Sequence, residues 1–316
     1  MTQPLAIVIP AYKDTYLRKS LESIASQSNK EFTLYIGDDA SPYDLKKIAD
    51  EFKNEIDLVY HRFQSNLGGE DLVAQWERCI DLTNNEPYIW LFSDDDVMEP
   101  GCVEAFYKLP QEIRDNYLLH YDVKIIDDLQ NGIILDAQRY QQKMSALDFI
   151  NDKINNKIIS FVVEYVFSRK LYKKARGFQK FDLAWGSDIT TWFKMASLCN
   201  GIYTIQAENS FVRWRKSSQN ITPNMSHDIT LRKMHALIEN AAFVQDMLVK
   251  LGQSRNFKIH AKSIWGAIMR HGTFLSYGDI LNLYFSYIKK VGFPLQSTIS
   301  FGVVILKKFI GVRYYA

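Results

Sequence analysis

The chain has 316 residues, of which 47% are hydrophobic and 23% are charged, and its formal net charge at pH 7 is +2. This length suits one large domain or a main domain with an appendage, and the composition is that of a globular protein with a sizeable core. The small net charge argues against a dedicated nucleic-acid-binding protein, so we expect no nucleic-acid partner.

The cysteines and the N-terminal residues indicate the cellular compartment in which the protein is expected. Cys79, Cys102 and Cys199 are far apart and odd in number, which predicts neither a disulfide framework nor a zinc site and fits a reducing compartment. The N-terminus enters an apolar run directly, without the basic segment and apolar core of a signal peptide. No run reaches the roughly 18 apolar residues of a membrane span. We therefore expect a cytoplasmic protein.

The first hundred residues alternate between apolar runs and segments with helical spacing of apolar residues. We expect helices from about residue 14 to 27, from Ser41 to 52 and from about 70 to 82, with Ser41 as N-cap and Pro42 at the first helical position of the second. This order predicts a βαβ series, hence a mostly parallel sheet with right-handed crossovers and helices on both faces. The strands are expected at residues 5–9, 32–37, 56–62 and 88–92.

Two acidic clusters follow the second and fourth of these strands, at residues 38–39 and 94–96. Ligands of open α/β sheets bind at the carboxyl ends of the strands, so both clusters are expected to line one crevice. Hard cations such as Mg²⁺ and Mn²⁺ prefer carboxylate and phosphate oxygens. The alternative is a solvated acidic turn before a helix that has Pro100 in its first turn. The solvated-turn explanation would have to apply to both acidic clusters, and both lie at the edge where such sheets bind ligands. We therefore favour the metal-binding crevice.

Five short motifs follow one another in this part of the chain: IVIPAY at 7–12, SLESI at 20–24 with QS at 27–28, GDDAS at 37–41, NLGG at 66–69 and SDDD at 93–96. Their order resembles the family 2 glycosyltransferases, which have the nucleotide-diphospho-sugar-binding fold called GT-A and whose acidic D-x-D motif occupies the slot of SDDD. The resemblance covers about residues 4 to 220. Ser93 stands where the commonest family form has an acid, and Ala74-Gln75-Trp76 replaces a frequent A-R-N.

The resemblance implies transfer of a sugar, with inversion, from a nucleoside-diphosphate sugar whose nucleotide we expect to be uridine. Asp95 and Asp96 are expected to bind Mg²⁺ or Mn²⁺ on the diphosphate. The residues expected to contact the donor nucleotide are Pro10, Ala11, Tyr12, Asp39, Asp94 and Asp95.

Two segments further along the chain complete the implied site. Asp188 follows Ser187, which can cap a helix, and capping chemistry alone would explain this acid. The resemblance implies instead that Asp188 is the general base. Arg215 lies in a basic strand, a common surface feature, but the resemblance implies that this segment covers the diphosphate with Arg215 as its contact. Ser217 falls where many relatives have a histidine, so that possible metal ligand is missing.

The remaining segments are less regular. Residues 117–126 and 132–135 are expected to be strands on the acceptor side, joined by a polar turn at 127–131. Residues 1–222 are expected to form the GT-A domain and 223–316 a C-terminal helical region. The last apolar segment comprises residues 301–310 and is followed by Arg313, Tyr314 and Tyr315. It suits a helix that lies in a membrane interface and equally a core helix docked on the catalytic domain, and we favour docking.

We therefore expect a metal-dependent inverting glycosyltransferase that modifies a glycan or lipid-linked acceptor in surface polysaccharide synthesis, in the cytoplasm or at the inner face of the membrane. Two other classes stay open. A sugar nucleotidyltransferase usually carries a Gly-rich basic loop after its first strand, which residues 10–13 lack. A non-catalytic sugar-nucleotide or glycan-binding subunit is disfavoured by the full set of acids and by Asp188.

Overall fold

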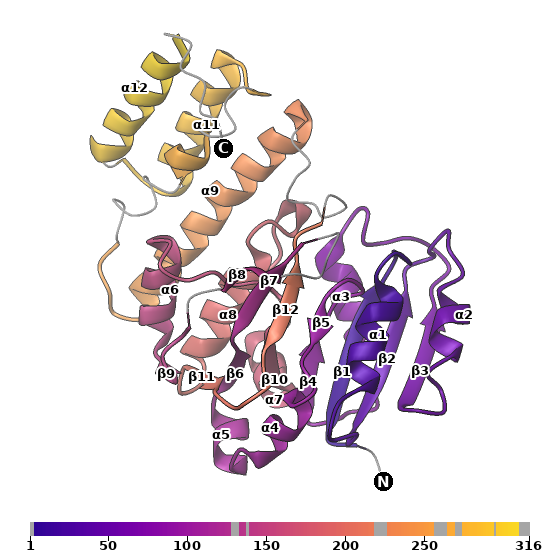
Figure 1. The fold of residues 1–316 in the computed structure, drawn as a ribbon. Coiled ribbons are helices and arrows are strands. Elements are labelled where there is room, and N and C mark those ends of the chain that lie inside the picture. The colour runs from indigo at the N-terminus through magenta and orange to yellow at the C-terminus, as the bar shows by residue number, and fades with distance from the viewer. Residues whose placement is uncertain are drawn as a thin grey trace. The chain divides into compact units, whose positions relative to one another are not determined.

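The computed structural model describes residues 3–127, 133–136, 139–217, 226–255, 264–268, 274–293 and 295–309. The chain divides into two compact units, one drawn from residues 1–153, 157–179 and 191–218 and the other from 154–156, 180–190 and 219–316. The second unit thus takes in residues 180–190, which precede the boundary predicted after residue 222. Figure 1 shows the elements of both units.

The first half of the first unit is the predicted βαβ series. Strand β1 is paired in parallel with β2 on one side and with β4 on the other, and β3 extends the sheet beyond β2. β2 and β4 are buried along their whole length, as expected for parallel strands covered on both faces. The elements are β1 (Leu5–Ala11), α1 (Leu17–Ala25), β2 (Phe32–Asp38), α2 (Leu45–Asp50), β3 (Asp57–Arg62), α3 (Leu72–Ile80) and β4 (Tyr88–Leu91).

Helices cover both faces of this sheet. Ile7 and Ile36 lie on the face that packs in one core with α1, α2 and α4 (Cys102–Lys108). Side chains alternate along a strand, so Gly37 faces the other way, and there a Cβ would come within 2.4 Å of Cys79 Sγ on α3. Glycine is therefore required for the close approach of α3. The predicted fold class is confirmed.

Within the described residues, the main sheet has eight strands in the order β3-β2-β1-β4-β10-β6-β11-β9. Strand β10 is antiparallel to both neighbours, whereas β6 and β11 are parallel. The four strands not yet given are β6 (Leu118–Tyr121), β9 (Lys143–Met144), β10 (Tyr165–Ser168) and β11 (Ile202–Ile205). The helices in the same part of the chain are α5 (Gln111–Asn116), α6 (Ala146–Ile154) and α7 (Arg169–Ala175).

A smaller sheet has the order β5-β12-β7-β8. Its strands are β5 (Val97–Met98), β7 (Val123–Ile126), β8 (Ile133–Asp136) and β12 (Val212–Arg215). Because β5 begins directly after the acidic residues 94–96, the loop that carries them joins the main sheet to the small one. This loop is consequently held at both ends.

Three local predictions are corrected. The run 117–126 is not one strand, because the chain leaves the main sheet at Asp122 and continues in the small sheet. Asp44, not Ser41, caps α2, since its side chain accepts the Lys47 N–H. Pro100 precedes α4 and lies outside its first turn. The predicted turn beyond residue 127, the loop 218–222 and residues 310–315 lie outside the described residues.

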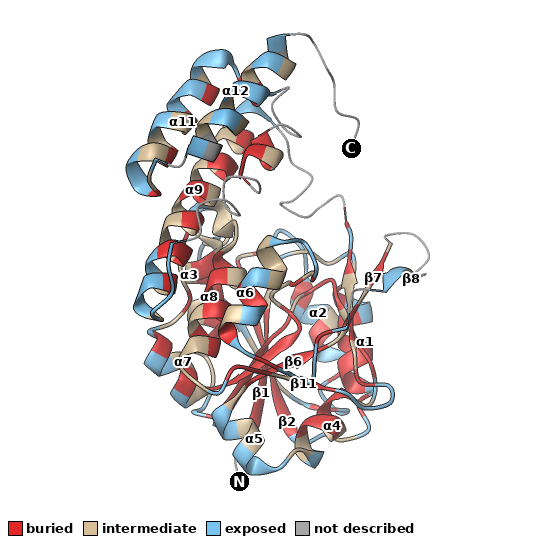
Figure 2. Cartoon of the chain, turned by 90° about the vertical axis from the view of Figure 1, so that its left-hand side faces the viewer, coloured by how far each residue is buried: buried red, intermediate tan, exposed pale blue. Residues whose placement is uncertain are grey.

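The second unit is helical. Helix α9 (His227–Lys250), residues 264–268, α11 (Tyr277–Lys290) and α12 (Leu295–Phe309) surround a core that contains Trp265 and Val304. Figure 2 shows exposed residues along the outer sides of α11 and α12. No helix among the described residues is long and apolar enough to cross a membrane.

Candidate active site

The two acidic clusters flank the end of β1, as predicted from the strand order. Asp38 lies beside Ala11 in the parallel register, and the Asp39 N–H donates to the Ala11 carbonyl oxygen at 2.9 Å. The second cluster follows β4 on the opposite side of β1. The chain segment that leaves β1 therefore runs between the two groups of carboxylates.

Asp94 fixes the segment after β1. Its Oδ2 accepts the backbone N–H groups of Tyr12 and Lys13, each at 2.9 Å. The carboxyl group is buried, and burial is the main cause that raises the pKa of Asp94 to about 6. Among the residues expected to contact the nucleotide in this segment, Ala11 is buried and Pro10 half-buried, whereas Tyr12 is 42% exposed.

Asp95 contacts Lys13, a residue that the sequence did not single out. Lys13 Nζ lies 2.9 Å from Asp95 Oδ2 and 3.8 Å from Asp94 Oδ1, and the Ser93 hydroxyl donates to Asp95 Oδ1. Burial works to lower the pKa of Lys13, but the charges of Asp94 and Asp95 outweigh it and the pKa is raised. The structure thus places an ammonium group among the predicted metal ligands.

Asp96 contacts β12 rather than β1. Its Oδ1 accepts the Arg215 backbone N–H at 2.7 Å. Burial, followed by the charge of Asp95, raises the pKa of Asp96 well above its ordinary value. A cation close to this carboxyl group would favour its ionised form.

Arg215 is fully buried. Its Nε donates to the Asp95 carbonyl oxygen at 2.8 Å and its Nη1 to the Asp127 carbonyl oxygen at 3.1 Å, and the guanidinium lies 4.2 Å from the centre of the Tyr16 ring. In the structure this side chain holds the acidic loop. Its predicted contact with a diphosphate stays a prediction.

The carboxylates suit a hard divalent cation in part. Asp95 and Asp96 are adjacent, buried and provide oxygen ligands, and Mg²⁺ is commonly bound by one or two carboxylates together with substrate phosphates and water. Within the described ranges there is no group of three or more His, Cys, Asp or Glu side chains arranged to hold a metal ion. The donor set therefore fits an ion whose coordination is completed by a phosphate-bearing ligand.

Asp39 organises the loop at residues 66–69. Its carboxylate accepts the N–H groups of Leu67 at 2.7 Å and Gly68 at 2.8 Å, the Asn66 amide at 3.1 Å, and the Arg78 guanidinium. A Cβ at Gly68 would lie 2.7 Å from Asp39 Oδ2, so this close approach requires glycine. A carboxylate has about four acceptor positions, and these four donors use them. A bound base or ribose would have to replace one.

Asp38 is enclosed. Its Oδ2 accepts the Tyr60 hydroxyl and Arg62 Nη1, the latter at 2.6 Å, and its Oδ1 accepts the Ser41 N–H at 2.7 Å. Beside them is an open hollow of about 420 Å³. Tyr60, Arg62 and Arg78 were not predicted as site residues, because single cations and tyrosines in a strand or helix carry no local signal.

Asp188 lies in the first turn of α8 (Ser187–Ser197), as predicted. It falls in the second unit, whereas the sequence placed it in the domain 1–222. Its Oδ1 accepts the Ile189 N–H at 2.8 Å. The preceding Gly186 has a φ of +80°, and its carbonyl oxygen accepts the Asn240 amide at 3.0 Å. A Cβ at Gly186 would lie 2.4 Å from Asn240 Nδ2, so glycine is needed for this entry into the helix.

The chain is similar to known glycosyltransferases. The family model described as glycosyl transferase family 2 matches residues 6–169. The structure of S. aureus TarS in complex with UDP-GlcNAc is 13% identical, with a TM-score of 0.56 over 99% of this chain and 93% of that chain. The complex of S. aureus TarS with UDP is 14% identical, with a TM-score of 0.55 over 98% and 93%.

A third structure is the mannosyltransferase PcManGT from Pyrobaculum calidifontis in complex with GDP-Man and Mn²⁺. It is 12% identical, with a TM-score of 0.51 over 97% of this chain and 87% of that chain. No curated protein sequence matches the chain. At these low identities the solved structures show a shared fold.

Proposed function

This chain belongs to glycosyl transferase family 2, and from that premise we propose that it is a metal-dependent, inverting glycosyltransferase that uses a nucleoside-diphosphate sugar. The observation that carries the proposal is the buried row of carboxylates after β4. Asp94 ties this row to the segment after β1, and Arg215 ties it to β12. Three charged groups are thus held in place at the sheet edge where α/β proteins bind ligands.

The proposed donor is a uridine diphosphate sugar, supported by the UDP-GlcNAc and UDP present in the TarS complexes. Tyr12 would lie against the base, since it is the exposed aromatic residue of the segment after β1. Asp39 and the loop that it holds, residues 66–68, would contact the nucleoside. Asp94 would hold the segment after β1 in place by accepting the backbone N–H groups of Tyr12 and Lys13.

Asp95 and Asp96 are proposed to hold Mg²⁺ or Mn²⁺, an ion that when bound would stabilise negative charge on the departing diphosphate. The Mn²⁺ in the PcManGT complex supports a divalent ion in this fold. Arg215 would assist at the diphosphate, as the family resemblance implies. Its hydrogen bond to the Asp95 carbonyl oxygen gives it a second way to act, by fixing the acidic loop.

Asp188 is proposed to accept the proton of the acceptor hydroxyl as that oxygen attacks the anomeric carbon. A helix N-terminus favours the ionised form of a carboxylate, which is the form that accepts a proton. General-base assistance contributes roughly 10²–10⁴ in rate. One displacement from the face opposite the diphosphate inverts the anomeric centre.

We further propose a lipid-linked or glycan acceptor of surface polysaccharide synthesis and a location at the inner face of the membrane. The support is an exposed apolar face on the second unit. The residues that form it recur every three or four positions along α11 and α12. Residues 277–309 also carry four lysines against one aspartate, a charge that suits anionic lipid. The large exposed apolar residues of α11 and α12 themselves are Tyr277, Leu281, Phe285, Leu295, Ile299, Val303, Leu306 and Phe309.

One experiment tests the activity. The purified chain is incubated with a panel of sugar nucleotides, with and without Mn²⁺, and release of nucleoside diphosphate is followed. Metal-dependent release that is lost in Asp96→Asn is the expected result. Binding without turnover would indicate a non-catalytic subunit. In a parallel incubation with a nucleoside triphosphate and a sugar 1-phosphate, formation of a sugar nucleotide and pyrophosphate would indicate a nucleotidyltransferase.

A further inference from the structure

The ammonium of Lys13 contacts an oxygen of Asp95, one of the two residues proposed to bind the metal ion. It lies 2.9 Å from Asp95 Oδ2, while Asp95 Oδ1 accepts the Ser93 hydroxyl. Both oxygens of Asp95 therefore have partners in the structure. The Lys13 side chain is 24% exposed, which leaves it a route out of the cluster.

A divalent ion and this ammonium exclude one another at Asp95. Mg²⁺ binds carboxylate oxygens at about 2.1 Å, so an ion on Asp95 Oδ2 would lie within roughly 5 Å of an ammonium that stayed on the same oxygen. Two like charges at that separation in a buried site repel strongly. Either Lys13 leaves when the ion arrives or the ion cannot use this oxygen.

The backbone of Lys13 does not need to move for this exchange. Its N–H is held by Asp94 Oδ2 at 2.9 Å, beside the equally held N–H of Tyr12. A lysine side chain has four flexible carbons and a compact charge, so rotation about its own bonds is enough to carry the ammonium away. After that rotation the ammonium could pair with the diphosphate of a donor bound at the same sheet edge.

We propose that Lys13 is a built-in counter-ion of the acidic cluster, which a divalent cation displaces and which then binds the donor diphosphate. The proposal rests on the proposed function, because it takes Asp95 and Asp96 as the metal ligands. Lys13 would keep Asp94 and Asp95 paired while no ion is bound. It would also make metal binding and diphosphate binding depend on each other.

The first test uses Lys13→Met, which keeps the length of the side chain and removes its charge. Mn²⁺ binding to the protein alone, measured by electron paramagnetic resonance, should become tighter by about tenfold or more, the effect of losing one charge-assisted hydrogen bond. Binding of uridine diphosphate at saturating Mn²⁺ should become weaker by a similar factor. A residue with a purely structural role would not change the two affinities in opposite directions.

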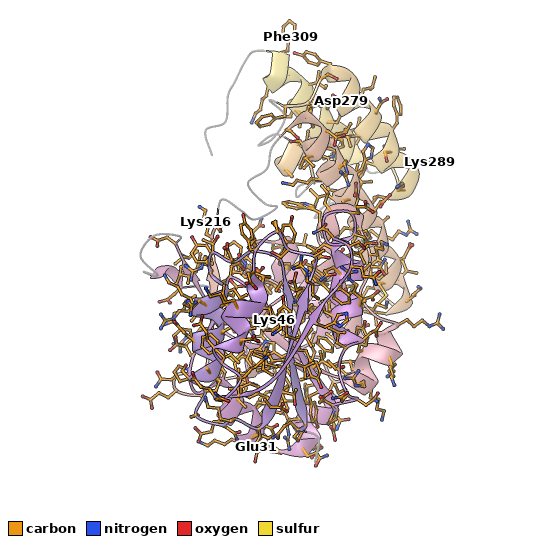
Figure 3. The ribbon with its side chains drawn as sticks, turned by 90° about the vertical axis from the view of Figure 1, so that its right-hand side faces the viewer. Glu31, Lys46, Lys216, Asp279, Lys289 and Phe309 are labelled. Carbon is orange, nitrogen blue, oxygen red and sulfur yellow. The ribbon has the colours of Figure 1, made fainter. Side chains whose placement is uncertain are left out.

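Lys46→Met is the matched control. Lys46, labelled on α2 in Figure 3, pairs with Asp50 at 2.7 Å on the helix surface. Its loss should leave both affinities unchanged. Unchanged or weaker Mn²⁺ binding in Lys13→Met would overturn the proposal.

The second test detects the displacement itself. The wild-type chain is treated with a small acetylating reagent, and modification of Lys13 is followed by mass spectrometry of its peptide, with Lys46 as internal reference. Mg²⁺ alone should speed acetylation of Lys13, and Mg²⁺ with uridine diphosphate should slow it again. Equal rates in all three conditions would show that Lys13 stays in place, and the proposal would be wrong.

Asp96→Asn separates this proposal from the proposed function. If Mn²⁺ binds the wild type and not Asp96→Asn, the metal site stands whatever the Lys13 variants show. If Mn²⁺ binding is the same in both proteins, Asp96 is not a ligand and the metal assignment fails with the inference drawn from it.

Discussion

The backbone N–H of Arg215 donates to Asp96 Oδ1 at 2.7 Å, which joins two segments separated by 119 residues in the sequence. Directly beside this contact, Val97 and Met98 of β5 pair with Arg213 and Val212 of β12. The acidic loop is consequently fixed by a β ladder as well as by Asp96 itself. Rigid placement of this kind is what an electrostatic site needs, because its charges then require no rearrangement during the reaction.

Asp96→Asn should remove metal-dependent binding while leaving the fold in place. The amide oxygen of asparagine can still accept the Arg215 N–H, but the negative charge that attracts a divalent ion is gone. Titration calorimetry with uridine diphosphate, with and without Mn²⁺, is the measurement. Asp50→Asn on α2 serves as control and should behave as wild type. Metal-dependent affinity that survives in Asp96→Asn would exclude Asp96 as a ligand.

Asp39→Ala should weaken binding of uridine diphosphate and of its sugar conjugate by similar factors, because Asp39 and the loop that it holds are proposed to contact the nucleoside. Gly68→Ala is the companion variant. It disturbs the same loop through a Cβ that would lie 2.7 Å from Asp39 Oδ2 and leaves the carboxylate present. If both variants lose affinity equally, Asp39 acts by holding the loop; if Asp39→Ala loses clearly more, the carboxylate itself contacts the nucleoside. A loss confined to the sugar conjugate would contradict both.

Those parts of the site that follow buried strands could be predicted from the sequence. Asp39 and Asp94 to Asp96 come directly after continuous apolar runs, and the parallel βαβ order alone brings the ends of such runs together. Lys13 and Arg78 could not be predicted in the same way. Each is one cation in an otherwise ordinary segment, and its partner is fixed only by tertiary structure.

The division of the run 117–126 between two sheets also has no local signal. Leu118–Tyr121 and Val123–Ile126 are equally apolar, and only Asp122 separates them. The Asp122 carbonyl oxygen accepts the Val212 N–H at 3.0 Å, so the change of sheet depends on a strand about ninety residues away in sequence. Hydrophobic periodicity describes burial and cannot distinguish which sheet buries a residue.

His120 should make the first unit less stable as the pH falls. It is buried against Tyr140, with its Nδ1 3.2 Å from Thr204 Oγ1, and burial lowers the pKa of His120 to about 3. The unfolded chain takes up a proton near pH 6.5, whereas the folded chain does not until near its own lower pKa, so folding stability declines between these values. The slope for one such group is about 1.4 kcal/mol per pH unit.

Chemical denaturation between pH 7 and about pH 4 measures this slope. His120→Gln should be less stable at pH 7 but should lose less stability on acidification than the wild type. His61→Gln, on the exposed side of β3, is the control and should keep the wild-type slope. Equal slopes in the wild type and His120→Gln would show that His120 does not cause the decline.

The exposed face of α11 and α12 should bind anionic vesicles. Figure 3 labels Lys289 and Phe309, which lie on the outside of these helices. Ile299→Glu combined with Leu306→Glu places charge on residues that are 60% and 59% exposed, so the core around Val304 is kept. Sedimentation with vesicles at low salt should be lost in this variant and retained in Val249→Glu, a control on α9. A wild-type chain that ignores such vesicles would contradict the membrane proposal.

Asp188→Asn decides whether this acid is the base or only a helix-capping residue. As the base, Asp188 should be needed for transfer, so the variant should keep donor affinity while its transfer rate falls by about 10²-fold or more. As a first-turn acid, it should contribute about 1 kcal/mol of stability or less, and turnover should remain nearly unchanged. Melting temperature and transfer rate measured on one preparation distinguish the two outcomes.

Asp182→Asn is the matched control for Asp188, because it removes a nearby acid of the second unit. Asp182 pairs with Arg232 at 2.7 Å on the surface, and its loss should cost little stability and no activity. Asn at position 188 can still accept the Ile189 N–H, the contact that Asp188 Oδ1 makes at 2.8 Å, so the helix start is retained and the comparison isolates the proton-accepting charge. A stable Asp188→Asn protein with full transfer would leave the described residues without an identified base. Full transfer by that variant would exclude the non-catalytic binding subunit and would leave the role of the base to another acid.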